Sequence, residues 1–139
     1  MKVIICGSIS AADEILVVKS QLEASGHEVE IPDGVKNLEL RARANAGDLE
    51  RADDKIKHNL IRGYFEKIKI HDIVLVVNPP KRGVDGYIGG NTLIEMAFAH
   101  VLAKPLYVLH EIPDLSYTSE ILAMQPILLH GDLSQIKQL

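Results

Sequence analysis

One segment restricts the possible folds more than any other: residues 73–77 form an unbroken apolar run, Ile-Val-Leu-Val-Val, in the middle of the chain. Half-exposed strands alternate apolar and polar residues, whereas strands covered on both faces, as in parallel sheets, are apolar throughout. Short strands are also predicted at residues 3–6, 106–109 and 127–129, and residues 27–31 alternate as an edge strand does. The sequence therefore predicts five strands.

Helices are predicted between these strands. Ser10 and Asp13 resemble a capping box, and apolar residues recur every three to five positions along a long second helix. Asn91 is expected to be the N-cap of a third, mostly apolar helix, which ends before Lys104 and Pro105. The other predicted helices are residues 11–24, 49–68, 119–124 and 133–138, and residues 35–47 show no sustained period.

Strands that alternate with helices imply right-handed crossovers and a sheet between two helix layers. The expected fold is α/β: a doubly wound, flavodoxin-like or Rossmann-like sandwich with a five-stranded, mostly parallel sheet. Its 139 residues fit a single domain, residues 1–139, with a core that needs no disulfide.

Composition and charge exclude several classes of partner. A formal charge of -4 argues against a nucleic acid polymer, because such binders have a basic face. The lone Cys6 suits a cytoplasmic protein, and the apolar run at the start of the chain is too short for a signal peptide or a membrane span. The histidines form no ligand pair, and neither Gly-x-Gly-x-x-Gly nor a Walker A pattern occurs, so we expect no metal and no cofactor.

Two loops are expected to meet where the first and third strands end, because doubly wound sheets bind ligands at the carboxyl edge. The first loop contains Gly7, Ser8 and Ile9 and could hold a small ligand at a helix N-terminus. The second, residues 78–90, is rich in glycine, which allows close approach of the backbone to a ligand. The candidate binding residues of this second loop and the helix start are Tyr87, Gly89, Gly90, Asn91 and Thr92.

Glu95 is the main candidate for chemistry, because it is the one acid on an apolar helix. A buried carboxyl group is unfavourable unless it is paired or functional. We expect the helix N-terminus to keep Glu95 ionised. Asp85, in the glycine-rich loop, could reach a substrate, and Tyr87 could stack on a base or a sugar. On topology alone Asp72 lies away from the site, at the amino end of its strand.

Three segments in this order resemble the nucleoside 2-deoxyribosyltransferase family, which includes 2′-deoxynucleoside 5′-phosphate N-hydrolases. They are Val-Ile-Ile-Cys-Gly-Ser-Ile at residues 3–9, Asp-Ile-Val-Leu-Val at residues 72–76 and Gly-Asn-Thr-Leu-Ile-Glu-Met-Ala-Phe-Ala at residues 90–99. Lys104-Pro105-Leu-Tyr-Val matches the next strand of the family, so the resemblance covers most of the chain.

The resemblance implies a homodimer or higher homo-oligomer that acts on a small-molecule nucleoside or nucleotide. Glu95 would be the nucleophile at the anomeric carbon, and Thr92 would orient it. Asp72 would match a catalytic acid of the family. Residues 7–9 would line the sugar pocket, and Met124 would approach the site of a neighbouring subunit.

The resemblance does not identify the group that protonates the departing base. Many of these transferases have an aspartate six residues before the glutamate, where this chain has Gly89, and Asp85 lies further back. Residues 89–95 are also similar to the loop of cytokinin-activating phosphoribohydrolases. Two further alternatives are a nucleotide-binding or sensing module without turnover, and an interaction scaffold that assembles through residues 49–68.

Overall fold

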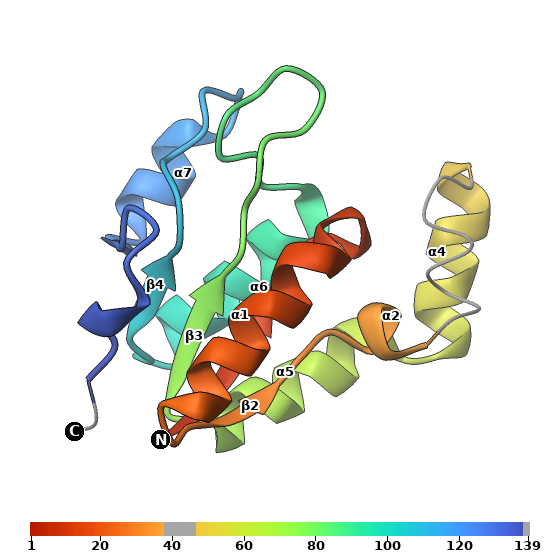
Figure 1. The fold of residues 1–139 in the computed structure, drawn as a ribbon. Coiled ribbons are helices and arrows are strands. Elements are labelled where there is room, and N and C mark those ends of the chain that lie inside the picture. The colour runs from red at the N-terminus through yellow and green to blue at the C-terminus, as the bar shows by residue number, and fades with distance from the viewer. Residues whose placement is uncertain (38–46, 138–139) are drawn as a thin grey trace.

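The computed structural model describes residues 1–37 and 47–137, with the backbone alone for residues 48–51. Five parallel strands form one sheet in the order β2-β1-β3-β4-β5, which confirms the predicted doubly wound α/β architecture and makes the sheet parallel throughout (Figure 1). The strands are β1 (Lys2–Cys6), β2 (Glu28–Glu30), β3 (Ile73–Val76), β4 (Leu106–Val108) and β5 (Ile127–Leu128).

Helices cover both faces of the sheet, and each central strand divides its side chains between them. Val3 and Ile5 of β1 face α1 (Ala12–Ala24), whereas Ile4 and Cys6 face the opposite core. That second core contains residues of α5 (Leu60–Ile70), α6 (Gly90–Val101) and α7 (Thr118–Ala123). Burial on both faces explains why residues 73–77 are apolar without interruption.

The predicted long helix at residues 49–68 is wrong, because the chain forms two helices there. The first, α4 (Asp48–Lys57), ends at Lys57, and α5 begins at Leu60 after Asn59, whose φ of 51° lies in the left-handed region. Asparagine tolerates this conformation better than most residues. The apolar spacing continues across the break, so the sequence pattern alone does not indicate that the helix is interrupted. In Figure 1, α4 stands away from the sheet at the end of α5.

Other helix ends also differ from the prediction. The expected capping box is absent: Ser8 Oγ accepts a hydrogen bond from the Ser10 N–H and starts the 3₁₀ helix η1 (Ile9–Ala11), which leads into α1. A short helix, α2 (Asp33–Lys36), follows β2. The closing helix expected at residues 133–138 is a 3₁₀ turn, η2 (Leu133–Gln135), within the described residues. Most of residues 35–47, which show no sustained period in the sequence, lie outside the described part of the chain.

No helix among the described residues has both the length and the apolar character needed to cross a membrane.

Candidate functional site

A cavity of about 510 Å³ lies at the carboxyl ends of β1 and β3. The loops that follow these two strands form part of its wall, and α2, α4, α5 and the start of α6 form the rest. This is the edge of the sheet where a doubly wound fold binds ligands. The volume lies within the range of pockets that enclose small organic ligands.

Most of the predicted site residues line this cavity. The structure brings together Gly7, Ser8, Ile9, Tyr87, Gly89, Gly90, Asn91, Thr92 and Glu95. Three predicted residues are not part of the wall: Asp72, Asp85 and Met124. Several cavity residues were not predicted, among them Asp33, Asp54, Lys55, Lys81 and Arg82.

Asp72 lies at the opposite edge of the sheet. One of its carboxylate oxygens accepts a hydrogen bond of 2.7 Å from the backbone N–H of Lys2, at the amino ends of β1 and β3. The topological expectation therefore describes Asp72 better than the catalytic role implied by the resemblance. Asp85 is exposed on the loop after β3, and Met124 follows α7 and packs on the core beneath α6 and α7.

Glu95 is buried within the first turns of α6, with 7% of its surface exposed. Its Oε1 accepts a hydrogen bond of 3.0 Å from the side-chain amide of Asn91, one turn earlier. Its Oε2 is buried and has no hydrogen-bond partner among the described residues. Asn91 is therefore not the N-cap, a position that Gly89 occupies, but the residue that orients the carboxyl group.

Burial raises the pKa of Glu95 from its ordinary value of 4.5 to about 8. The Cys6 thiol and the Asn91 amide oppose this rise, the nearby charge of Asp33 adds to it, and Lys55 lowers the pKa slightly. The expectation that Glu95 is kept ionised is wrong, because desolvation by burial is the largest influence on its pKa. At neutral pH about one molecule in ten has an ionised Glu95.

Cys6 and Thr92 have supporting positions. Burial, and then the charge of Glu95, raise the pKa of the Cys6 thiol well above its usual range, so the thiol stays protonated. Thr92 is buried and lines the cavity, but no hydrogen bond from it to Glu95 is found in the described part of the chain. The orienting role expected of Thr92 belongs to Asn91.

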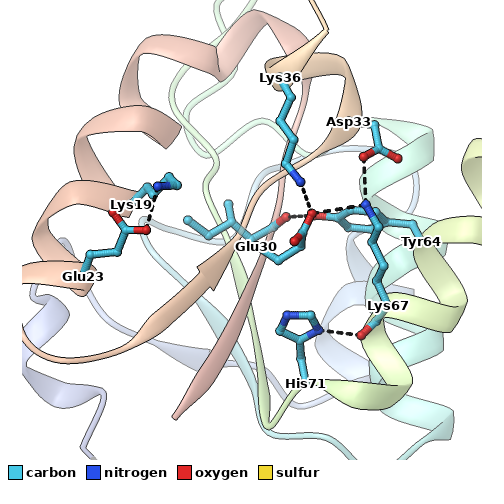
Figure 2. A network of polar contacts seen from close by, with 9 residues as sticks. Lys19, Glu23, Glu30, Asp33, Lys36, Tyr64, Lys67 and His71 are labelled. Atoms are coloured by element: carbon cyan, nitrogen blue, oxygen red, sulfur yellow. Dashed lines mark hydrogen bonds and ion pairs between the residues drawn. The ribbon is translucent and has the colours of Figure 1, made fainter.

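Asp33 brings a second carboxyl group to the cavity from α2. Its Oδ1 lies 2.8 Å from Lys67 Nζ, and Lys67 also contacts Glu30 at 3.2 Å (Figure 2). Lys36 pairs with the same oxygen of Glu30. In the sequence, Pro32-Asp33-Gly34 has the composition of a simple turn, and nothing nearby identifies Asp33 as a site residue.

A buried asparagine fixes the glycine-rich loop to the sheet. The Asn78 side-chain amide donates to the carbonyls of Gly86 at 3.1 Å and Glu111 at 2.9 Å, and its oxygen accepts from the His110 N–H at 3.0 Å. At Gly86, where φ is 66°, an added Cβ would lie 2.2 Å from the Glu111 carbonyl oxygen. Tyr117 also donates to the Ile88 carbonyl. The loop therefore presents residues 87–91 from a rigid base.

Replacing Asn78 by alanine is expected to destabilise the fold by about 2–4 kcal/mol, because it leaves buried backbone groups without partners. Chemical denaturation monitored by circular dichroism measures this change. The exposed Asp85 in the same loop provides a control, since its replacement by alanine should change stability by less than about 0.5 kcal/mol. Equal, small effects of the two substitutions would show that Asn78 does not anchor the loop.

No cluster of three or more potential metal ligands occurs among residues that the structure describes. Comparisons of the chain with protein-family models, with curated proteins and with solved structures gave no match, so the chemistry of the cavity is the basis for its function.

Proposed function

We propose that this protein cleaves or exchanges the N-glycosidic bond of a nucleoside or nucleotide, with Glu95 as the nucleophile, as in nucleoside 2-deoxyribosyltransferases. The observation that carries the proposal is the carboxyl group of Glu95: it is buried, it is oriented by Asn91, it belongs to the wall of a cavity of ligand size, and its second oxygen has no hydrogen-bond partner among the described residues. A native fold rarely leaves a buried polar atom unpaired without a functional reason.

The chemistry follows from this geometry. An oxygen of the ionised Glu95 carboxylate attacks the anomeric carbon, a C–O bond forms, and the C–N bond breaks with its electron pair leaving on the base. The base takes up a proton from solvent as it departs. Water or a second base then attacks the same carbon, which releases the sugar and restores the Glu95 carboxylate. The Asn91 amide stabilises the charged form of the nucleophile throughout.

The loop after β3 supplies a surface for the flat part of such a ligand. The Tyr87 ring lies against Gly89, where an added Cβ would be 3.5 Å from a ring carbon. Lys81 Nζ lies 5.5 Å from the centre of the same ring. An aromatic ring held in this way can stack on a base or cover one face of a sugar.

A panel of ribonucleosides, 2′-deoxynucleosides and their 5′-monophosphates tests the proposal, each with and without an acceptor base. Released base and exchanged product are separated by chromatography. Free base without acceptor would indicate hydrolysis, and a new nucleoside with acceptor would indicate transfer. No product from any member of the panel would refute the proposed activity.

Activity is expected to rise with pH, because only the ionised Glu95 can attack. Below pH 8, kcat/KM should increase about tenfold per pH unit and then level off near pH 8, where the pKa of Glu95 lies. The Asn91→Ala variant should move the midpoint to higher pH, because the amide lowers the pKa of Glu95. A flat profile from pH 6 to 9, or an unchanged midpoint in Asn91→Ala, would contradict this assignment.

The high pKa of Glu95 also favours one alternative, a nucleotide-binding module without turnover. A neutral carboxyl group donates a hydrogen bond, and it could hold a ligand hydroxyl or carbonyl at neutral pH. Calorimetry on the same panel separates the two functions. Tight binding without released base over the whole pH range would support the binding module.

A homo-oligomer is part of the proposal. Ile94 and Val101 of α6 are 39% and 81% exposed and, seven residues apart, lie on one face of the helix. Leu122 of α7 is 56% exposed. Apolar groups in such a position favour contact with a second copy of the chain, which sedimentation analysis would detect.

A further inference from the structure

The cavity contains a second carboxylate, Asp33, that the attack by Glu95 does not use. Both residues line the same cavity, but they come from different walls: Glu95 from α6 and Asp33 from α2. The close packing of α2 on the first loop fixes its position, since a Cβ added at Gly34 would lie 2.6 Å from Ile9 Cδ1. Asp33 therefore has a fixed position in the wall of the cavity.

Neighbouring side chains hold the Asp33 carboxylate in place. Lys67 Nζ binds Oδ1 at 2.8 Å, and Glu30 fixes Lys67 from the other side at 3.2 Å. Figure 2 shows Asp33 and Lys67 facing each other across α2 and α5. The ion pair uses Oδ1 and leaves Oδ2 outside it. Lys67 and Glu30 themselves do not line the cavity.

The direction of attack decides which part of the ligand meets this wall. Displacement at the anomeric carbon places the departing base on the side opposite the attacking oxygen of Glu95. The walls formed by α2, α4 and α5 are then available to the base. Pro32, Leu60 and Ile61, together with Ile9 of the first loop, give this part of the cavity an apolar surface for a flat ring, and Asp54 and Lys55 of α4 complete it.

We propose that Asp33 determines base specificity, by accepting a hydrogen bond from the exocyclic amino group of the base. This inference rests on the proposed function and defines its substrate class: nucleosides or nucleotides of bases such as adenine and cytosine. A carboxylate accepts hydrogen bonds and cannot donate them, so it pairs with an N–H group and repels a carbonyl oxygen at the same position.

Amino and oxo bases of nearly equal shape provide the test. The substrates are adenosine with inosine and cytidine with uridine, in the sugar and phosphate form that the enzyme cleaves. The wild type is expected to show a ratio of kcat/KM for amino over oxo substrates of about 10 to 100. In Asp33→Asn, whose amide can donate to an oxo group, the ratio should fall at least about tenfold.

Glu30→Gln is the matched control, because it disturbs the same ion-pair network outside the cavity. It should leave the amino-to-oxo ratio unchanged, even where it lowers stability or overall rate. A structural role for Asp33 would lower the rates on all substrates together and leave the ratio as in the wild type, and that result would overturn the inference. A wild-type preference for oxo bases would overturn it as well.

Failure of the proposed activity would not obscure this result. If the wild type releases no base, the same ratio is measured as Kd for the intact nucleosides by calorimetry, in wild type, Asp33→Asn and Glu30→Gln. An amino preference in Kd that Asp33→Asn alone removes would support the role of Asp33. Equal Kd values for amino and oxo ligands would refute it.

Discussion

Replacing Glu95 by glutamine is expected to reduce base release by about 1000-fold or more, because the variant lacks the attacking carboxylate. Glutamine keeps the size of the side chain and can still interact with Asn91, so the cavity should keep its shape. Its amide oxygen is a far weaker nucleophile than a carboxylate. Chromatographic assays at pH 8, where half of the wild-type Glu95 is ionised, give the largest contrast.

Two measurements show whether the lost activity reflects the nucleophile itself. Mass spectrometry of wild-type enzyme quenched during turnover should detect a covalent sugar adduct on residues 90–101, and Glu95→Gln should have none. Calorimetry should show that Glu95→Gln still binds the nucleoside within about tenfold of the wild-type Kd. A variant with near wild-type turnover would exclude Glu95 as the nucleophile.

The fold could be predicted because its signal is spread over many residues. The apolar run at residues 73–77 and the alternation of strands and helices define a parallel sheet, and the topology rule then places two loops at one edge. The glycine-rich loop and Glu95 could be found for the same reason. Their positions depend on the order of elements and not on any single contact.

Details that depend on one contact could not be predicted. The break at Asn59 arises from a single left-handed residue within a continuous apolar pattern. Asn91 was expected to be the N-cap of the helix. Gly89 occupies that position instead, and the Asn91 amide donates to Glu95. Asp33 begins α2, far from the glycine-rich loop in sequence, and the packing of α2 on Ile9 helps to place it at the cavity.

The charge state of Glu95 could not be predicted from the sequence either, since it depends on how completely the side chain is buried. A helix N-terminus contributes a fraction of a kcal/mol to about 2 kcal/mol, whereas full burial of a carboxylate shifts its pKa by several units. Burial is the largest of the influences on the pKa of Glu95. Folding therefore favours the neutral form of Glu95, whereas the proposed attack requires its ionised form.

The stability of the fold is therefore expected to decrease as the pH rises from 4.5 to 8. Because the pKa of Glu95 is higher in the folded chain than its ordinary value of 4.5, the folded state binds the extra proton, and this contribution is complete below pH 4.5. It is lost as the pH rises through about 8. The difference in pKa, from 4.5 to about 8, corresponds to a loss on the order of 5 kcal/mol.

Comparison of the wild type with Glu95→Gln isolates this effect from the titration of all other groups. Chemical denaturation at several pH values should show that the variant gains about 2 kcal/mol relative to the wild type between pH 6 and pH 8. Thr92→Ala, a change at a buried residue of the same helix that does not titrate, should differ from the wild type by a constant amount over this range. If the Glu95→Gln difference is constant too, Glu95 is ionised throughout, and the fall in activity below pH 8 must come from another group.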